Sequence, residues 1–453
     1  MSPDCRCGRP CTSAGTAVMR DSVAWQRYLQ RHIETNLPDC SNTTSRWHRA
    51  LVIPVYRESA TLLQQLYALP GGQGRSLVIL VLNRPDSDPD QQANAALRGA
   101  IAELASSAML EEHTPLYRLN DHADLYVHDM EQPGGPVAAA QGVGLARKTG
   151  CDIALKWMSA GVIDGPWICC TDADATLPQD YFTRLDDASA EVVAATFPFR
   201  HVDTQEQSCN AATALYELRL HHYVLGLEYA GSPYAYHSLG SCLAVKADAY
   251  AQVRGFPKRA GAEDFYLLNK LAKLGNVARL QGKCIELQTR YSTRVPFGTG
   301  PAVASIARSK QQAESPLFYH PQCFQALRAL LEVTPALRQS TSAQLLQLLR
   351  AQGLDEALAP VCCAQLDSMG LDAALAHCRR QGKSPEQFLR QFHQWFDAFR
   401  SLKFIHGIRD AGWPQQSLTA LAAAHPQLWP GNDCPPVAIE NLRHSIRQHW
   451  GWQ

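Results

Sequence analysis

Trp167-Ile168-Cys169-Cys170-Thr171-Asp172-Ala173-Asp174 is the stretch that decides the fold of this chain. Four apolar residues in a row are typical of a strand that is covered on both faces. Asp172 and Asp174 stand at positions i and i+2 of the turn behind it, so both carboxylates can point into one site. Carboxylates that close repel each other unless a divalent cation joins them. The alternative is a solvated acidic turn or the N-cap of a helix near Pro178, but the fully apolar strand favours a site.

Two further apolar runs precede this strand. Residues 50–56 read ALVIPVY, and residues 77–82 read LVILVL with turn residues directly behind them. A shorter strand is expected at 125–128. The segments between these runs repeat apolar residues at helical spacing. The expected helices cover residues 60–69, 91–110 and 137–158, the last of them broken near Gly150.

This alternation of strands and helices predicts an α/β fold with a largely parallel sheet and helices on both faces. In such sheets ligands bind beyond the carboxyl ends of the strands. The chemistry is therefore expected in three segments that follow apolar runs, namely residues 54–58, 83–90 and 171–176.

The character of the sequence changes at two places, which predicts three parts. Residues 1–47 form an N-terminal extension with an expected helix from Ser22 to Ile33. Residues 48–305 hold the α/β alternation. Residues 306–453 are rich in Leu and Ala and contain few strand candidates. We expect a helical C-terminal region there, with residues 345–349 as its clearest amphipathic piece.

Composition narrows the class of protein. The chain has 453 residues, 46% of them hydrophobic, and its 42 Lys plus Arg balance 42 Asp plus Glu. A formal net charge of zero gives no electrostatic reason to bind nucleic acid or an anionic membrane. No run approaches the roughly 18 apolar residues of a spanning helix, and we see no apolar signal core. We expect a soluble, cytoplasmic protein with no integral membrane segment.

The 15 cysteines are scattered along the chain, so buried reduced thiols are their expected state. Cys5, Cys7 and Cys11 form the only tight group. No second Cys/His pair at zinc spacing follows them, so a metal site there is the minor alternative.

Glu263 and Asp264 are the second chemical signal, because they open an expected helix after Gly261-Ala262. Acids in a first helical turn can simply favour the helix dipole. Alternatively, one carboxylate faces a cleft as the general base that takes a proton from an attacking hydroxyl. Its neighbour then orients that hydroxyl.

Taken together, these signals resemble the nucleotide-diphospho-sugar glycosyltransferases of the GT-A fold, close to the family-2 type, with a Rossmann-like sheet. In that family the first strand ends in a Pro-x-Tyr-x-Glu-like segment, matched here by Pro54, Tyr56 and Glu58. An Ala-Arg-Asn region is matched at Ala146-Arg147-Lys148, with Lys in place of Asn. Asp172 and Asp174 match the D-x-D metal motif, and Glu263-Asp264 match the late acidic pair. The match covers roughly residues 50–305.

The resemblance has two departures. The family usually has an Asp after its second strand where Asn83 stands here, with Asp86 and Asp88 further on. An amide can still hydrogen-bond a base edge, so nucleotide binding is kept and the identity of the base is open. The Gln-x-x-Arg-Trp signature of processive synthases is missing, which argues against polymer synthesis and export.

Arg290 and Arg294 lie four residues apart beside the Gly298-Thr299-Gly300 loop. Such arginines can clamp phosphate oxygens through paired hydrogen bonds, and the loop can close over the donor. The alternative is two surface arginines and an ordinary turn.

Histidines are a weaker signal. His237 is a candidate metal ligand or acceptor contact, because some relatives supply a third ligand from His. His221 and His222 are expected on a helix, one packed and one exposed.

The resemblance implies a metal-dependent glycosyltransferase that moves one sugar from a UDP- or GDP-linked donor to a hydroxyl acceptor, with inversion favoured. It implies Mg²⁺ or Mn²⁺ on Asp174 with help from Asp172, and Asp264 as the base with Glu263 orienting it. The residues implied for nucleotide and ribose are Pro54, Tyr56, Glu58, Asn83, Arg147 and Asp172.

Two alternatives come from other classes. A nucleotidyltransferase of the same fold needs a Gly-rich loop after the first strand, but Val55-Tyr56-Arg57-Glu58-Ser59 has no glycine. A catalytically silent scaffold would use the helical C-terminal region to dock a partner. The two acidic pairs argue against a scaffold, because docking requires no crowded carboxylates.

Overall fold

The computed structural model describes residues 22–40, 43–111, 114–132, 134–292, 294, 298–309, 314–424, 429–430 and 439–453. The first 21 residues of the predicted N-terminal extension, with the Cys5, Cys7 and Cys11 group, lie outside these residues. The predicted helix after Ser22 is present as α1 (Val23–Arg31), and the Ser22 side chain caps it by accepting from Trp25 N.

The centre of the fold is an eight-stranded sheet in the order β10-β7-β9-β5-β1-β2-β4-β3. The β1–β2, β1–β5, β2–β4 and β7–β10 pairs are parallel, and the other three neighbouring pairs are antiparallel. A second sheet has the order β6-β11-β8. The strand bounds are β1 Arg49–Val55, β2 Ser76–Leu82, β3 Leu116–Arg118, β4 Ala123–Asp129, β5 Trp167–Cys170, β6 Ala175–Thr176, β7 Val192–Thr196, β8 Phe199–Val202, β9 Leu243–Lys246, β10 Asn276–Arg279 and β11 Ile285–Gln288.

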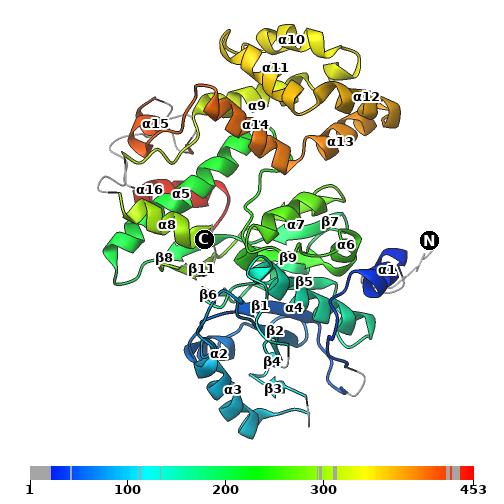
Figure 1. Cartoon of the computed structure of the whole chain (residues 1–453), viewed down its shortest axis with the longest axis vertical. Coiled ribbons are helices and arrows are strands. Elements are labelled where there is room, and N and C mark those ends of the chain that lie inside the picture. The colour runs from blue at the N-terminus through cyan, green and yellow to red at the C-terminus, as the bar shows by residue number, and fades with distance from the viewer. Residues whose placement is uncertain are drawn as a thin grey trace, which may run out of the picture.

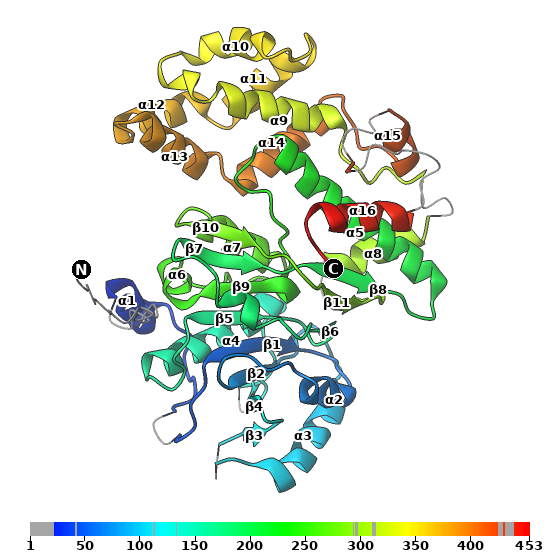
Figure 2. The same cartoon turned by 180° about the vertical axis from the view of Figure 1, so that it is seen from behind.

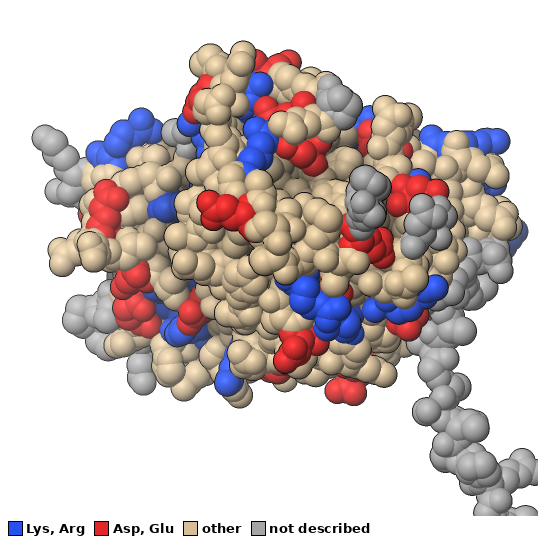
Figure 3. All heavy atoms as spheres, turned by 90° about the horizontal axis from the view of Figure 1, so that it is seen from below, with Lys and Arg blue, Asp and Glu red and all other residues tan. Residues whose placement is uncertain are grey.

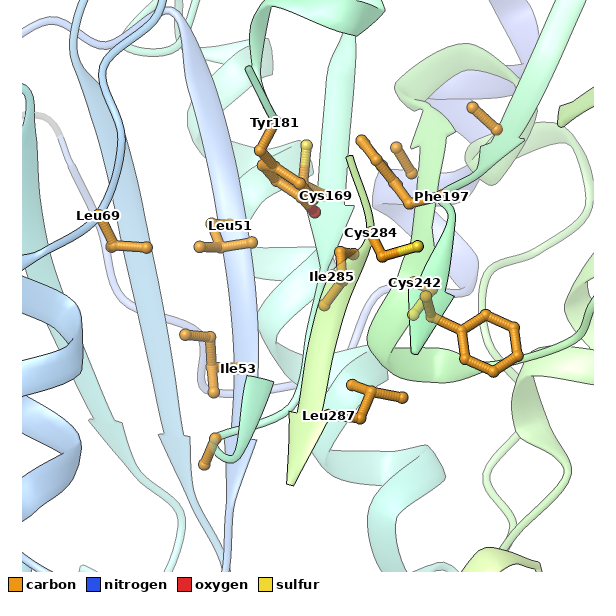
Figure 4. Packing of buried hydrophobic residues seen from close by; sticks show 14 of the residues in the cluster. Leu51, Ile53, Leu69, Cys169, Tyr181, Phe197, Cys242, Cys284, Ile285 and Leu287 are labelled. Carbon is orange, nitrogen blue, oxygen red and sulfur yellow. The ribbon is translucent and has the colours of Figure 1, made fainter. Parts of the chain in front are cut away.

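Helices cover both faces of the main sheet, so the predicted α/β class is confirmed. Alternate residues of β1 divide between the two faces, as a strand's period of two requires. Leu51, Ile53 and Val55 pack in one core cluster, which Figure 4 shows in part. Ala50 and Val52 pack in a second cluster with α4 and α7. The α-helices that follow α1 and begin before residue 305 are α2 Thr61–Tyr67, α3 Ala95–Ala108, α4 Gly142–Ser159, α5 Gln207–Tyr229, α6 Ala247–Gln252, α7 Glu263–Leu271 and α8 Thr299–Ala307.

The predicted break near Gly150 is wrong, because α4 runs through it without interruption. Gly150 serves the packing of the helix on the sheet. A Cβ added there would lie 2.4 Å from Val52 Cγ1. The missing side chain therefore lets α4 lie close against β1. From the sequence alone, the same glycine was interpreted as a break in the helix.

Helices α9 to α14 form a group at one end of the molecule, apart from the main sheet (Figure 1). They enclose a third core cluster, in which residues of the predicted amphipathic piece, Leu345 and Leu349, are buried. The bounds of these helices and of the two that follow them are α9 Pro321–Val333, α10 Leu345–Ala351, α11 Leu358–Ser368, α12 Leu371–Gln381, α13 Pro385–Trp395, α14 Ala398–Asp410, α15 Leu418–Ala424 and α16 Ile439–His449. The predicted division into three parts stays a prediction.

The last helix does not stay with that group. In both cartoon views α16 lies beside α5 (Figures 1 and 2). The chain end then joins the segment before β11, where Gly282 N donates to Gly451 O (3.0 Å) and Cys284 N donates to Gln453 O (2.9 Å). The C-terminus therefore lies next to the smaller sheet, at the start of β11.

The described residues bear on two predictions about the whole chain, the state of the cysteines and the membrane-spanning segments. The cysteines among them are all free, and all but the half-buried Cys363 are buried. None of the described helices combines the length and apolar character that a membrane span requires. On the face seen in Figure 3, basic and acidic side chains are interspersed among neutral residues.

Candidate active site

One cavity of about 540 Å³ opens at the carboxyl ends of β1, β2 and β5. All eleven residues that the sequence analysis assigned to catalysis, to the nucleotide sugar or to the metal line it, from six separate parts of the chain. These residues are Pro54, Tyr56, Glu58, Asn83, Arg147, Asp172, Asp174, Glu263, Asp264, Arg290 and Arg294. The two acidic pairs, some ninety positions apart in sequence, therefore share one cavity.

Arg147 joins those two acidic pairs. Its Nη2 lies 2.5 Å from Asp172 Oδ1, and its Nε lies 2.9 Å from Glu263 Oε1. The arginine is 3% exposed. Burial by itself would lower the pKa of Arg147, but the carboxylates of Asp172 and Glu263 raise it. The guanidinium is thus a fixed positive charge between the two motifs.

The local backbone explains how Arg147 reaches both partners. Its Nη1 donates to Gly240 O at 3.0 Å, and a Cβ at Gly240 would lie 2.5 Å from Nη2. In the first turn of α4, Gly144 N donates to Arg259 O at 2.9 Å, which holds the segment before α7 against α4. Glycines at these two close contacts therefore let Arg147 and Glu263 meet.

Glu263 and Asp264 form the first turn of α7, behind Ala262 in the left-handed region with φ 55°. A non-glycine residue there costs on the order of 1–2 kcal/mol, which the surrounding contacts must offset. Burial, followed by the negative charge of Glu263, raises the pKa of Asp264 to about 7. A carboxylate with a pKa near neutrality is suited to general base catalysis.

Asp174 lies in a second charged group. Arg290 Nη2 lies 2.6 Å from Asp174 Oδ2 and 3.0 Å from Glu58 Oε1, and Arg294 also pairs with Glu58. Burial raises the pKa of Asp174, and the charge of Arg290 opposes that shift. The predicted arginine pair is thus in the cavity, not on the outer surface. Thr293 and residues 295–297 lie outside the described residues, so the loop closure stays a prediction.

Asp88 lies next to the cavity residue Tyr56 and holds the segment after β1 in place. Tyr56 OH donates to Asp88 Oδ2 at 2.5 Å, and Arg57 Nη2 donates to Asp88 Oδ1 at 2.7 Å. Hydrogen bonds from Arg57 and then Tyr56 hold the pKa of Asp88 well below its usual range. Asn83 instead donates to Val55 O at 3.0 Å, between β2 and β1. Its predicted contact with the base stays a prediction.

Lys148 takes no part in this cavity. Its Nζ lies 2.6 Å from Asp152 Oδ2 and 2.9 Å from Tyr28 OH. The position that the resemblance aligns with a family Asn therefore anchors α1 to α4.

The predictions for the histidines differ from the structure. His221 and His222 are both buried in α5, so the expectation that one is exposed is wrong. His221 packs against Trp450 near the chain end, and His222 packs against Phe324 of α9, so α5 is covered on two sides. His237 is buried beside His221, at 3.0 Å between ring nitrogens, and is absent from the cavity lining. His201, which sequence reasoning missed, lines the cavity.

The donor set fits a hard divalent cation held by two carboxylates. Carboxylate oxygens suit Mg²⁺ or Mn²⁺, and Mg²⁺ is commonly bound by one or two carboxylates plus substrate phosphates. Among the described residues no group of three or more His, Cys, Asp or Glu side chains is placed to hold a metal. The charged residues of the lining are five carboxylates and three guanidinium groups, a formal charge of −2. An anionic ligand would therefore be repelled unless a cation accompanied it.

Comparison with known proteins gives distant structural matches only. No family model matches the chain, and no curated protein matches it. Residues 1–349 of S. aureus TarS in complex with UDP-GlcNAc are 13% identical, with 74% of this chain and 92% of that chain covered and a TM-score of 0.35. The mannosyltransferase PcManGT from Pyrobaculum calidifontis, in complex with GDP-Man and Mn²⁺, is 16% identical, with 82% and 92% covered and a TM-score of 0.34. With TM-scores below 0.5, these matches carry no argument about the function of this chain.

Proposed function

We propose that this protein is a metal-dependent glycosyltransferase that moves a single sugar from a nucleotide diphosphate donor to a hydroxyl acceptor. The observation that carries the proposal is the shared cavity. It contains Asp172 and Asp174 at the end of a parallel strand and Asp264 with its raised pKa, with Arg147 linking Asp172 to Glu263.

In this proposal Asp264 takes the proton from the acceptor hydroxyl. The acceptor oxygen then forms its bond to the anomeric carbon while the bond from that carbon to the phosphate oxygen breaks, and the nucleoside diphosphate leaves. By the resemblance, the displacement is in line and inverts the anomeric carbon. Glu263 is held by Arg147 at 2.9 Å, so it fixes the first turn of α7 and with it the position of Asp264.

Asp174 and Asp172 would hold the Mg²⁺ or Mn²⁺. When bound, such an ion neutralises the charge that develops on the departing diphosphate. The formal charge of −2 in the lining gives an independent reason for a cation, because a diphosphate alone would meet net repulsion. Arg290 pairs with Asp174 and Glu58. When a diphosphate binds beside these acids, the guanidinium can donate to a phosphate oxygen instead.

Tyr56, held by its hydrogen bond to Asp88, would contact the nucleotide. Tyr56 is anchored through its hydroxyl, so its ring is held in place at the cavity wall. We place the base and ribose between Pro54, Tyr56 and Asn83 on one side and Arg147 and Asp172 on the other.

The test is nucleotide binding followed by donor hydrolysis. UDP or GDP with Mn²⁺ in hundredfold excess over Kd should stabilise the wild type by about 2.7 kcal/mol, seen as a raised melting temperature. Asp174→Ala should lose the metal-dependent part of this shift. A panel of UDP- and GDP-linked sugars should then reveal one donor that is slowly hydrolysed. Absence of any metal-dependent nucleotide binding would refute the proposal.

A further inference from the structure

His201 in β8 is a cavity residue whose two ring nitrogens have different surroundings. Its Nδ1 lies 2.9 Å from Glu217 Oε2, and its backbone N donates to the same oxygen at 2.7 Å. A carboxylate can only accept, so Nδ1 carries the hydrogen. Nε2 has no hydrogen-bond partner among the described residues and is not sealed off as His221 Nε2 is, so it meets the cavity.

The ring is held by a buried charged group from outside the cavity. Arg443 of α16 donates to both oxygens of Glu217, at 2.7 Å and 3.0 Å, and to His201 O at 2.9 Å. Glu217 and Arg443 are 0% and 4% exposed. Such a saturated ion pair keeps one geometry, so the orientation of the imidazole is fixed before any ligand arrives.

Strand register places His201 beside the diphosphate position but not on it. Leu287 of β11 is in register with His201 on one side and with Ala175, directly after Asp174, on the other. Two strand spacings put the Cα atoms of Ala175 and His201 roughly 10 Å apart. This separation puts His201 beside the proposed metal site, with β11 between them. We therefore take its ligand to be a neighbouring part of the donor.

Two threonines lie in the same part of the lining as His201. Thr213 and Thr289 line the cavity, but their Oγ1 atoms are sealed off and have no hydrogen-bond partner among the described residues. His201 Nε2 is therefore the atom of this group that can reach a ligand. A neutral ring nitrogen accepts a hydrogen bond, and a sugar hydroxyl is a group that can donate one.

We propose that His201 is a donor-sugar-binding residue, whose Nε2 accepts a hydrogen bond from a hydroxyl of the transferred sugar. Glu217 and Arg443 act through it as positioning residues. This inference rests on the proposed function and names the part of the cavity that holds the sugar.

The test compares nucleotide sugar with bare nucleotide on His201→Asn. The Asn amide nitrogen can replace Nδ1 toward Glu217, so the buried ion pair keeps its partner while Nε2 is lost. Calorimetry with Mn²⁺ and the UDP- or GDP-sugar that the wild type binds tightest should show about tenfold weaker binding, the size of one hydrogen bond. Binding of the matching free UDP or GDP should stay within twofold.

His201→Gln is the matched variant, because its amide reaches toward the Nε2 position, and it should recover part of the lost affinity. His128→Asn, at a half-buried histidine absent from the cavity lining, should leave both affinities unchanged. Equal losses for sugar nucleotide and nucleotide, or no loss on His201→Asn, would overturn the role of His201. A wild type that binds nucleotide but no nucleotide sugar overturns it too, whereas one that binds neither overturns the proposed function as well.

Discussion

Arg147 and Lys148 are neighbours on α4, yet they lie in two charged groups of opposite character. Arg147 faces the cavity, and its partner Asp172 keeps 38% of its side chain exposed. Lys148 faces the other way, and its partner Asp152 is 0% exposed. Asp152 also accepts from Tyr28, Tyr250 and Glu34 N.

The difference in exposure between Asp152 and Asp172 distinguishes a structural charged network from a candidate binding site. Around Asp152 every nearby donor is already used inside the protein, which ties α1, α4 and α6 together. Around Asp172 and Asp174 part of each carboxylate faces an open cavity, so lone pairs are left for a cation or a substrate. Buried charge by itself therefore does not mark a functional site, whereas charge at a cavity wall marks a candidate for one.

The largest effect on stability is expected in the closed network. Lys148→Met leaves Asp152 buried without its cation and should lower the free energy of unfolding by about 3–5 kcal/mol. Urea denaturation checks this value. Lys148→Met combined with Asp152→Leu should recover part of the loss, because no buried charge then remains. An unchanged stability in the single variant would contradict the structural reading of this group.

The largest effect on activity is expected in the open group. Asp264→Asn should reduce transfer by about 10²–10⁴-fold, the range typical of a lost general base. Metal-dependent nucleotide binding should persist, since the amide is nearly isosteric. Single-turnover assays and calorimetry measure the two separately. Full activity in this variant would show that another group is the base.

The pH dependence of Asp264 sharpens the contrast. Its folded pKa of about 7 is above its unfolded value, so folding favours its protonated form. The stability from this group is therefore present below about pH 4 and is lost as the pH rises toward 7. Activity should run the opposite way and fall as the pH drops below about 7, because the base must be ionised. A difference curve of unfolding free energy, wild type minus Asp264→Asn, checks the sign. A stability difference that grows with pH would contradict it.

A smaller effect is expected from Arg147→Lys. Lysine keeps the positive charge but lacks the fork that reaches Asp172, Glu263 and Gly240 O together. We expect a loss of activity of about ten- to hundredfold, from one or two weakened charged hydrogen bonds. The matched control is Arg98→Lys, whose partners Asp129 and Glu131 are absent from the cavity lining. Its activity should be unchanged, and an equal loss in both variants would point to stability alone.

The residues that the sequence could assign share one property, which is that each belongs to a short local pattern. Asp172 and Asp174 directly follow an apolar strand, and Glu263 and Asp264 open a helix. The rule that ligands gather at strand ends then brought them to one cavity. His201 had no such pattern, because it is a single histidine in a strand of four residues.

Partner choice was beyond sequence reasoning for a physical reason. Arg443 and Glu217 are 226 positions apart, and they meet only because α16 returns from the helical group to lie on α5. The spacing of apolar residues in the sequence does not reveal that the chain returns in this way. Likewise, Gly150 suggests a helix break when only its neighbours in sequence are considered, but in the structure it is a close contact between α4 and β1.

The amino-acid order by itself determined the α/β class and the position of the acidic motifs at a strand end and at a helix start, since burial period and local turns are properties of neighbouring residues. The tertiary structure decided which charges are saturated and which face a cavity. That outcome depends on side chains far apart in the chain that can form the same hydrogen bonds, and only the folded arrangement decides which donors and acceptors pair.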